Sequence, residues 1–264
     1  FNWLSVQDKN KKANQPFFDN KKRYALIFNG EIFNFKELID KYLIYENFET
    51  KSDTEVLFKL LIRFRDKVLD ELEGFFSFAF FDFHEDYFLL VRDRFGIKPL
   101  YYFIENDCLY FASTFRALDS ISSNSNNNLD SYLSFFLIGS IAGSNTTNKN
   151  IYQLEPGSFM IYKKQNLSKN YYYSLIPSLL ENKYKNTNLE EITNYLKYVI
   201  KKYSLSEADK SLMLSSGIDS NILYSQLNKI NTYTLIFNNK NIFSESKYIK
   251  QSNNNYILNS KYSL

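Results

Sequence analysis

Residues 75–92 read FFSFAFFDFHEDYFLLVR, two apolar runs separated by a short polar segment. The two runs, 75–83 and 87–92, have the length of strands. The polar segment between them, residues 84–86, is short enough to join antiparallel neighbours. This stretch therefore predicts a β-hairpin rich in aromatic side chains, within an antiparallel sheet on which helices pack.

The residues before this hairpin predict a further chain reversal and two helices. Residues 24–28 are apolar and end at Asn29-Gly30, a dipeptide that favours a tight hairpin turn because both residues tolerate a positive φ. A helix is predicted at 35–43. Ser52-Asp53-Thr54-Glu55 has the pattern of a capping box and predicts a helix that continues to about Phe64.

The residues after the hairpin predict more strands and then a change of organisation. Strand-like runs lie at 100–104 and 108–112. The polar stretch 163–188 has no steady period and is interpreted as a linker. Apolar residues then recur at helical spacing over 189–202. We therefore expect two domains, residues 1–162 and residues 189–264.

The expected second domain contains a βαβ unit. The pattern predicts a strand at 211–214, a loop at 215–219, a helix at 220–228 and a strand at 232–237. The loop then lies at the carboxyl end of a strand, which is where open α/β sheets bind ligands.

The composition excludes several classes of protein. Of the 264 residues, 44% are hydrophobic, which is enough for a sizeable core. The 32 basic and 29 acidic residues give a net charge of +3, which indicates neither a nucleic-acid nor a membrane partner. One Cys and one His exclude a disulfide framework and argue against a structural zinc site. With no apolar run of about 18 residues and no export leader, we expect a cytoplasmic protein.

Two segments carry residues suited to chemistry. A side-chain amide beside a glycine N–H, as in Asn29-Gly30, can supply the two donors of an oxyanion hole, although an ordinary hairpin turn is the more common explanation of this pair when it is taken alone. Asp53 is explained by a helix N-cap when it is taken alone. The small residues 215–220 can bind phosphate at a helix N-terminus, with Asp219 on a magnesium ion and the hydroxyls of Ser215 and Ser220 on phosphate oxygens. A plain strand–helix turn is the alternative.

Together these segments resemble glutamine-hydrolysing asparagine synthetase. The segments that carry the resemblance, in family order, are FNGEIFN at 28–34, SDTEV at 52–56, LEGFFSFA at 72–79, RDRFGIKPLYY at 92–102, LEPG at 154–157 and LSSGIDS at 214–220. The resemblance implies a class II amidotransferase domain with the N-terminal-nucleophile fold, an α+β αββα antiparallel sandwich. The start of an α/β ATP-pyrophosphatase domain, like that of adenine nucleotide α-hydrolases, would follow.

The same resemblance implies an activity. Glutamine would be hydrolysed to ammonia in the first domain. ATP and Mg²⁺ would activate aspartate as β-aspartyl-AMP in the second domain, where ammonia would displace AMP and give asparagine. The enzyme would be cytoplasmic and possibly a homodimer. This chain, which begins without Met and stops within an α/β unit, is expected to be a piece of it, truncated at both ends.

Site residues follow from the matched motifs. Asn29 and Gly30 would form the oxyanion hole, while Glu31 and Asp53 would hold the α-amino group of glutamine. Main-chain groups of Leu4, Ser5 and Val6 would line the same pocket. The ATP-binding residues would be Leu214, Ser215, Ser216, Gly217, Ile218, Asp219, Ser220 and Leu235, with Asp219 also on Mg²⁺.

The chain also departs from the family pattern. The family nucleophile is an N-terminal Cys, whereas Cys108 lies in a strand-like run, has no free α-amine and is expected to be a small buried hydrophobe. We therefore expect these residues alone to be inactive. Trp3 stands where the family has the Arg that binds the glutamine carboxylate. Two alternatives remain: a related enzyme that acts on another carboxylate, such as a β-lactam-synthetase-like protein, and a non-catalytic protein that binds glutamine or nucleotide.

Overall fold

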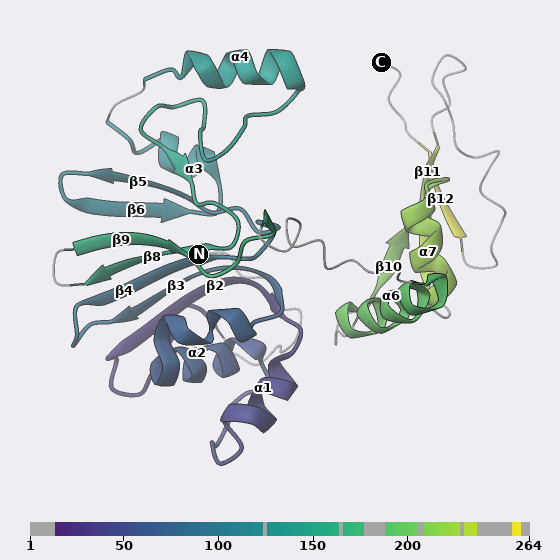
Figure 1. The fold of residues 1–264 in the computed structure, drawn as a ribbon, viewed down its shortest axis with the longest axis horizontal. Coiled ribbons are helices and arrows are strands. Elements are labelled where there is room, and N and C mark those ends of the chain that lie inside the picture. Colours follow the sequence, from purple (N-terminus) through teal and green to yellow (C-terminus); the bar gives the residue numbers. More distant parts are fainter. Residues whose placement is uncertain are drawn as a thin grey trace. The chain divides into compact units, whose positions relative to one another are not determined.

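The structure is a computed structural model and describes residues 14–123, 126–163, 166–176, 188–204, 209–227, 230–236 and, for the backbone, 255–259. The chain forms two compact units, residues 1–183 and residues 184–264, and each is described by itself (Figure 1). Among the described residues, no helix combines the length and the apolar character that crossing a bilayer requires.

The first unit is built on a six-stranded antiparallel sheet with the strand order β1-β2-β3-β4-β8-β9. Its strands are β1 (Phe17–Phe18), β2 (Tyr24–Ile32), β3 (Gly74–Asp82), β4 (Tyr87–Arg92), β8 (Ser158–Lys163) and β9 (Asn166–Tyr171). The predicted aromatic hairpin is confirmed as β3 and β4, which pair from Ser77 with Arg92 to Asp82 with Tyr87.

A second antiparallel sheet has the order β6-β5-β7, and helices lie outside both sheets (Figure 1). Its strands are β5 (Tyr101–Glu105), β6 (Cys108–Ala112) and β7 (Tyr152–Gln153). The helices of this unit are α1 (Phe35–Tyr42), α2 (Asp53–Phe64), the 3₁₀ segment η2 (Arg65–Glu71), α3 (Phe115–Asp119) and α4 (Leu129–Ile138).

The alternation of side chains along β3 explains how these layers pack. Phe76, Phe78 and Phe80 share a buried cluster with the apolar face of α2. Ala79 points to the opposite face and clusters with residues of the second sheet, including Tyr102. A further cluster joins the second sheet to α3. The result is a helix–sheet–sheet–helix sandwich, so the αββα layers expected of this domain are confirmed.

The structure differs from the sequence prediction at two points of this unit. Asn29-Gly30 is not a turn, because β2 continues through it to Ile32 in an unbroken pairing with β3. The predicted linker 163–188 contains β9, all of whose residues are exposed; among the described strands, β9 pairs only with β8. An exposed edge strand has no buried face and hence no apolar alternation to signal it.

The second unit contains a parallel sheet with the strand order β10-β11-β12. Its elements are α6 (Leu189–Tyr203), β10 (Ser211–Met213), α7 (Ile218–Gln226), β11 (Asn231–Ile236) and β12 (Asn255–Asn259). Because β10 and β11 are parallel neighbours joined through α7, the predicted βαβ unit is confirmed. Residue 237, the expected end of its second strand, lies outside the described residues.

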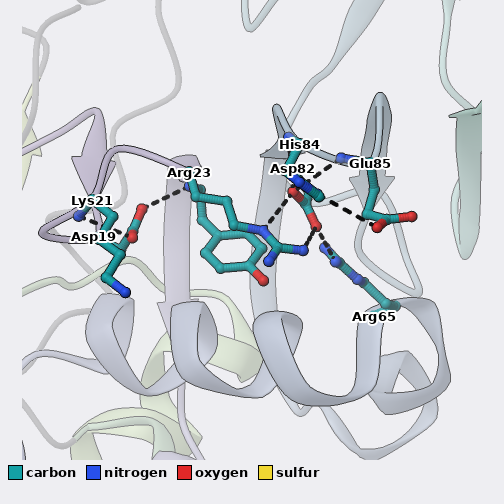
Figure 2. Close-up of polar contacts among 8 residues, drawn as sticks. Asp19, Lys21, Arg23, Arg65, Asp82, His84 and Glu85 are labelled. Atoms are coloured by element: carbon teal, nitrogen blue, oxygen red, sulfur yellow. Dashed lines mark hydrogen bonds and ion pairs between the residues drawn. The ribbon is translucent and has the colours of Figure 1, made fainter.

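Asp82, the last residue of β3, organises a polar cluster in the first unit (Figure 2). Arg23 donates to both carboxylate oxygens at 3.0 and 3.1 Å, and Arg65 donates to Oδ2. Burial alone would raise the pKa of Asp82, but the hydrogen bonds from the two guanidinium groups outweigh it and hold this pKa well below its usual range. Since Asp82 pairs with Tyr24, the cluster lies at the opposite end of β2 from Ile32.

Candidate functional site

The N–H groups along one edge of β2 form the core of the candidate site. Phe33 N–H donates to the carbonyl of Glu73 on the β3 side at 2.8 Å. Because hydrogen-bonded and non-hydrogen-bonded pairs alternate in an antiparallel ladder, Gly30 belongs to a non-hydrogen-bonded pair and its N–H points away from β3. The N–H groups of Phe28 and Ile32 point to the same edge.

Side-chain acceptors occupy this edge on both sides of Gly30. The side-chain Oε1 of Gln15 accepts the Phe28 N–H at 2.6 Å, and Asp53 Oδ2 accepts the Ile32 N–H at 2.8 Å. The N–H of Gly30 lies between them, next to a buried carboxylate. An oxyanion at this position would complete a row of three acceptors along β2.

Glycine is required at position 30 by a close approach. Its φ is +153°, and a Cβ built there would lie 2.0 Å from the carbonyl oxygen of Phe75 and 2.6 Å from Cα of Phe76. The dipeptide that resembles a turn signal is therefore explained by the contact with β3.

Asp53 and Glu31, two of the predicted glutamine-binding residues, come together at this site. Asp53 is 3% exposed and Glu31 is half-buried. Burial and, second, the negative charge of Glu31 raise the pKa of Asp53 to about 7, although the hydrogen bond from Ile32 works in the opposite direction. Two carboxylates this close favour a cation between them, because a positive charge relieves both the burial penalty and the mutual repulsion.

The start of α2 positions Asp53. Ser52 is confirmed as the N-cap, since its hydroxyl accepts the Thr54 N–H at 3.1 Å. Asp53 itself is the first helical residue, so its carboxylate remains available to β2. Glu55 does not complete the predicted capping box: its carboxylate accepts the N–H and the hydroxyl of Thr50, each at 2.7 Å, and so braces the loop before the helix.

Of the remaining residues predicted for this site, the structure describes Asn29 but not the N-terminal stretch. Asn29 pairs with Ser77 and is half-buried, and both side chains lie on the face of the sheet that carries Ala79. The stretch with Leu4, Ser5 and Val6, together with Trp3, lies outside the described residues. A cavity of about 520 Å³ is lined by residues of β5, β7, β8 and β9 and by Asn150, and it contains none of the predicted site residues.

The first two residues of the matched segment 92–102 have a structural role that the motif does not indicate. Arg92 donates to three carbonyls, those of Lys98 at 3.0 Å, Leu154 at 2.6 Å and Gly96 at 2.7 Å. Asp93 is fully buried and accepts several backbone N–H groups. An Arg-Asp pair at the end of a buried strand is the available signal, because buried charges require polar partners.

In the second unit, the predicted phosphate loop lies between β10 and α7. The hydroxyls of Ser215 and Ser220 lie 3.0 Å apart, and the Gly217 N–H donates to Ser215 Oγ at 3.2 Å. Gly217 is the N-cap of α7, and Asp219 is exposed in its first turn. The loop is thus compact and accessible at the carboxyl end of a parallel strand. Leu214 is buried behind it, and Leu235 lies in the neighbouring strand.

Other candidate groups are not gathered into sites. Among the described residues, no three His, Cys, Asp or Glu side chains lie close enough together to hold a metal ion. Cys108 was expected to be buried and is exposed, because it is the first residue of β6 beside the turn. His84 is largely exposed in the β3–β4 turn.

The family of glutamine amidotransferase domains matches residues 2–173, and the chain belongs to this family. It resembles glutamine-hydrolysing asparagine synthetases in particular. A putative enzyme of this kind from Methanocaldococcus jannaschii is 28% identical, over 94% of this chain and 52% of that protein. Asparagine synthetase 2 of Bacillus subtilis is 31% identical, over 94% of this chain and 35% of that protein. The chain thus spans about half or less of the length of these relatives.

Among solved structures, the allosteric regulatory enzyme of purine biosynthesis is similar with a TM-score of 0.42 and 18% identity. The similarity covers 92% of this chain and 51% of that one.

Proposed function

We propose that the first unit binds glutamine for hydrolysis to ammonia, and that the whole protein uses this ammonia as an ATP-dependent asparagine synthetase. The observation that carries the proposal is the convergence of Asp53, Glu31 and the Gly30 N–H at one edge of β2, within a glutamine amidotransferase domain. The similarity to asparagine synthetases supports the second part of the proposal, in which the ammonia is used to make asparagine.

The chemistry follows from the order of groups along this edge. The α-ammonium group of glutamine lies against Glu31 and Asp53, which become a neutralised pair of carboxylates. The side-chain carbonyl then faces Gly30 N–H and the Asn29 amide. When a nucleophile attacks that carbonyl, its oxygen gains negative charge, and the preorganised donors stabilise it. The resemblance implies an N-terminal Cys as nucleophile, a role that the exposed Cys108 does not fill.

The second unit is proposed to bind ATP through residues 214–220 and Leu235. Support comes from the loop geometry: the hydroxyls of Ser215 and Ser220 and the N-terminus of α7 meet at the edge where α/β sheets bind nucleotides. Asp219 is a single carboxylate, which fits Mg²⁺ because this ion is commonly held by one or two carboxylates together with substrate phosphates. When bound, the ion would neutralise phosphate charge during aspartate activation. A cytoplasmic location and a homodimer complete the proposal.

The proposed glutamine site is tested by calorimetry with L-glutamine and N-acetyl-L-glutamine. The wild-type chain is expected to bind only the first, because acetylation removes the cation that Asp53 and Glu31 receive. Asp53→Asn should weaken L-glutamine binding by about tenfold or more, the usual effect of losing a charged hydrogen-bond partner. Asp40→Asn, the same change at an exposed position of α1, is the matched control. Equal binding of both ligands would refute the proposal.

A further inference from the structure

Asp93, the residue that follows β4, forms hydrogen bonds through both its side chain and its main chain. Its Oδ1 accepts the N–H groups of Phe95 at 3.1 Å and Ile97 at 3.0 Å. Its Oδ2 accepts those of Phe76 at 3.2 Å and Lys98 at 2.9 Å. The carboxylate therefore has both oxygens fully used by backbone donors, and the residue is completely buried.

The main chain of Asp93 adds three more hydrogen bonds. Its N–H donates to the carbonyl of Phe76 at 2.8 Å, and its carbonyl accepts the N–H groups of Gly96 at 3.0 Å and Gly157 at 2.8 Å. Phe76 is thus held at both of its backbone polar groups by one residue.

Phe76 is the residue that lies opposite Gly30. The two form a register pair, and the backbone of residues 75 and 76 approaches Gly30 so closely that no Cβ fits between them. Because the backbones of Phe76 and Gly30 are in such close contact, the position of Phe76 determines the position of the Gly30 peptide. An oxyanion donor must be held within a few tenths of an ångström of its productive position to be effective.

We propose that Asp93 is a positioning residue for the oxyanion hole: it fixes Phe76, and through the close Phe76–Gly30 contact it fixes the Gly30 N–H. The role of Gly30 as an oxyanion donor rests on the proposed function. The mechanical link from Asp93 through Phe76 to Gly30 rests on the contacts alone. Asp93 does not contact the substrate. It also ties this strand position to the loop 95–98 and to the turn at Gly157.

Arg92 provides a matched control. It holds the same loop through the carbonyls of Gly96 and Lys98 and reaches Leu154, but none of its side-chain hydrogen bonds involves Phe76. Asp93→Asn and Arg92→Lys therefore disturb the same loop. Only the first lowers the number of acceptors beside Phe76: the Asn amide keeps one oxygen for four backbone N–H groups, and in either orientation the repulsion between its NH₂ group and the other two N–H groups weakens the contact with Phe76.

The first measurement is amide hydrogen exchange in the 264-residue chain. Asp93→Asn should speed exchange at Phe76 and shift the Gly30 amide resonance, whereas Arg92→Lys should affect the loop and leave both unchanged. If Asp93→Asn does not fold, the wild-type protein still decides: Phe76 should open together with the amides of Phe95, Ile97 and Lys98. Independent opening of Phe76, or equal effects of the two variants, would overturn the inference.

The second measurement compares the affinities for L-glutamate and L-glutamine by calorimetry. The γ-carboxylate of glutamate places an anionic oxygen at Gly30, so its binding depends on the exact position of that N–H more than glutamine binding does. Asp93→Asn should lower glutamate affinity by about tenfold or more while glutamine affinity changes little, and Arg92→Lys should preserve the ratio. Parallel losses for both ligands would overturn the role at the oxyanion hole. If wild type binds neither ligand, the proposed function fails, and the exchange experiment alone decides the mechanical link.

Discussion

Two buried aspartates lie at opposite ends of the β2–β3 pair and have opposite electrostatic surroundings. Asp82 receives hydrogen bonds from Arg23 and Arg65, so its ionised form is favoured. Asp53 is buried beside Glu31, so its neutral form is favoured. Burying a carboxylate beside a second one is costly in a structural role, and this cost supports the proposed role of Asp53 in binding a cationic ligand.

The raised pKa of Asp53 predicts how stability depends on pH. Its ordinary value is 3.8 and its value in the folded protein is about 7. Between these values the folded state holds a proton that the unfolded state has lost, so the contribution of Asp53 to the free energy of unfolding falls as pH rises from 4 through 7. Asp53→Asn should remove this dependence in thermal unfolding scans from pH 4 to pH 8. An unchanged slope would contradict the assignment.

The depressed pKa of Asp82 predicts the opposite behaviour. Its contribution to stability is present above the ordinary value of 3.8 and is lost as pH falls below it. Urea unfolding of the wild-type protein and of Asp82→Asn should therefore differ most near neutral pH and converge in acid. A difference that stays constant down to pH 2 would show that the two guanidinium contacts do not govern this carboxylate.

At the scale of elements, β2 depends on the close approach at Gly30. Gly30→Ala would place Cβ against the backbone of Phe75 and Phe76 and is expected to lower the free energy of unfolding by about 3 kcal/mol or more. Gly139→Ala is the control, since Gly139 also has a positive φ, +76°, but has open space around it. The strain of a left-handed backbone should by itself lower the free energy of unfolding of Gly139→Ala by about 1 kcal/mol. Urea denaturation measures both, and equal losses would contradict the close-contact account.

The elements that could be predicted from sequence are those with a strong local signal. The β3–β4 hairpin, the helix that begins after Ser52 and the βαβ unit all combine an apolar period with polar ends. Gly30 was misread because glycine serves both turns and close contacts, and only the pairing with β3 distinguishes the two uses. The edge strand β9 was missed because it has no buried face.

The candidate site shows the same limit. The resemblance points to Glu31, Gly30 and Asp53 because they lie in short motifs, and the structure brings these three residues to one edge of β2. Asp93 also lies in a matched motif, but its role depends on Phe76, which is 17 residues earlier in the chain. A contact between residues on different strands leaves no local pattern in the sequence. The role of Asp93 can therefore be recognised only when the pairing of the strands is known.

At the scale of the whole molecule, the second unit is expected to bind nucleotide weakly. The exposed loop between β10 and α7 offers phosphate contacts and one carboxylate, so calorimetry with MgATP should give a Kd above about 1 μM. Asp219→Ala should remove the benefit of Mg²⁺, while Asp209→Ala, an exposed acid before β10, should not. If Mg²⁺ strengthens ATP binding by the same factor in both variants, or if EDTA weakens binding in neither, the role of Asp219 is contradicted.

The most direct test of the central claim is a crystal structure of the chain with L-glutamine. The account predicts the α-ammonium nitrogen within about 3 Å of carboxylate oxygens of Asp53 and Glu31, with the side-chain carbonyl directed at the Gly30 N–H. Glutamine seated instead in the cavity beside Tyr102 and Lys169, or an Asp53 carboxylate that makes no contact with the ligand, would contradict it.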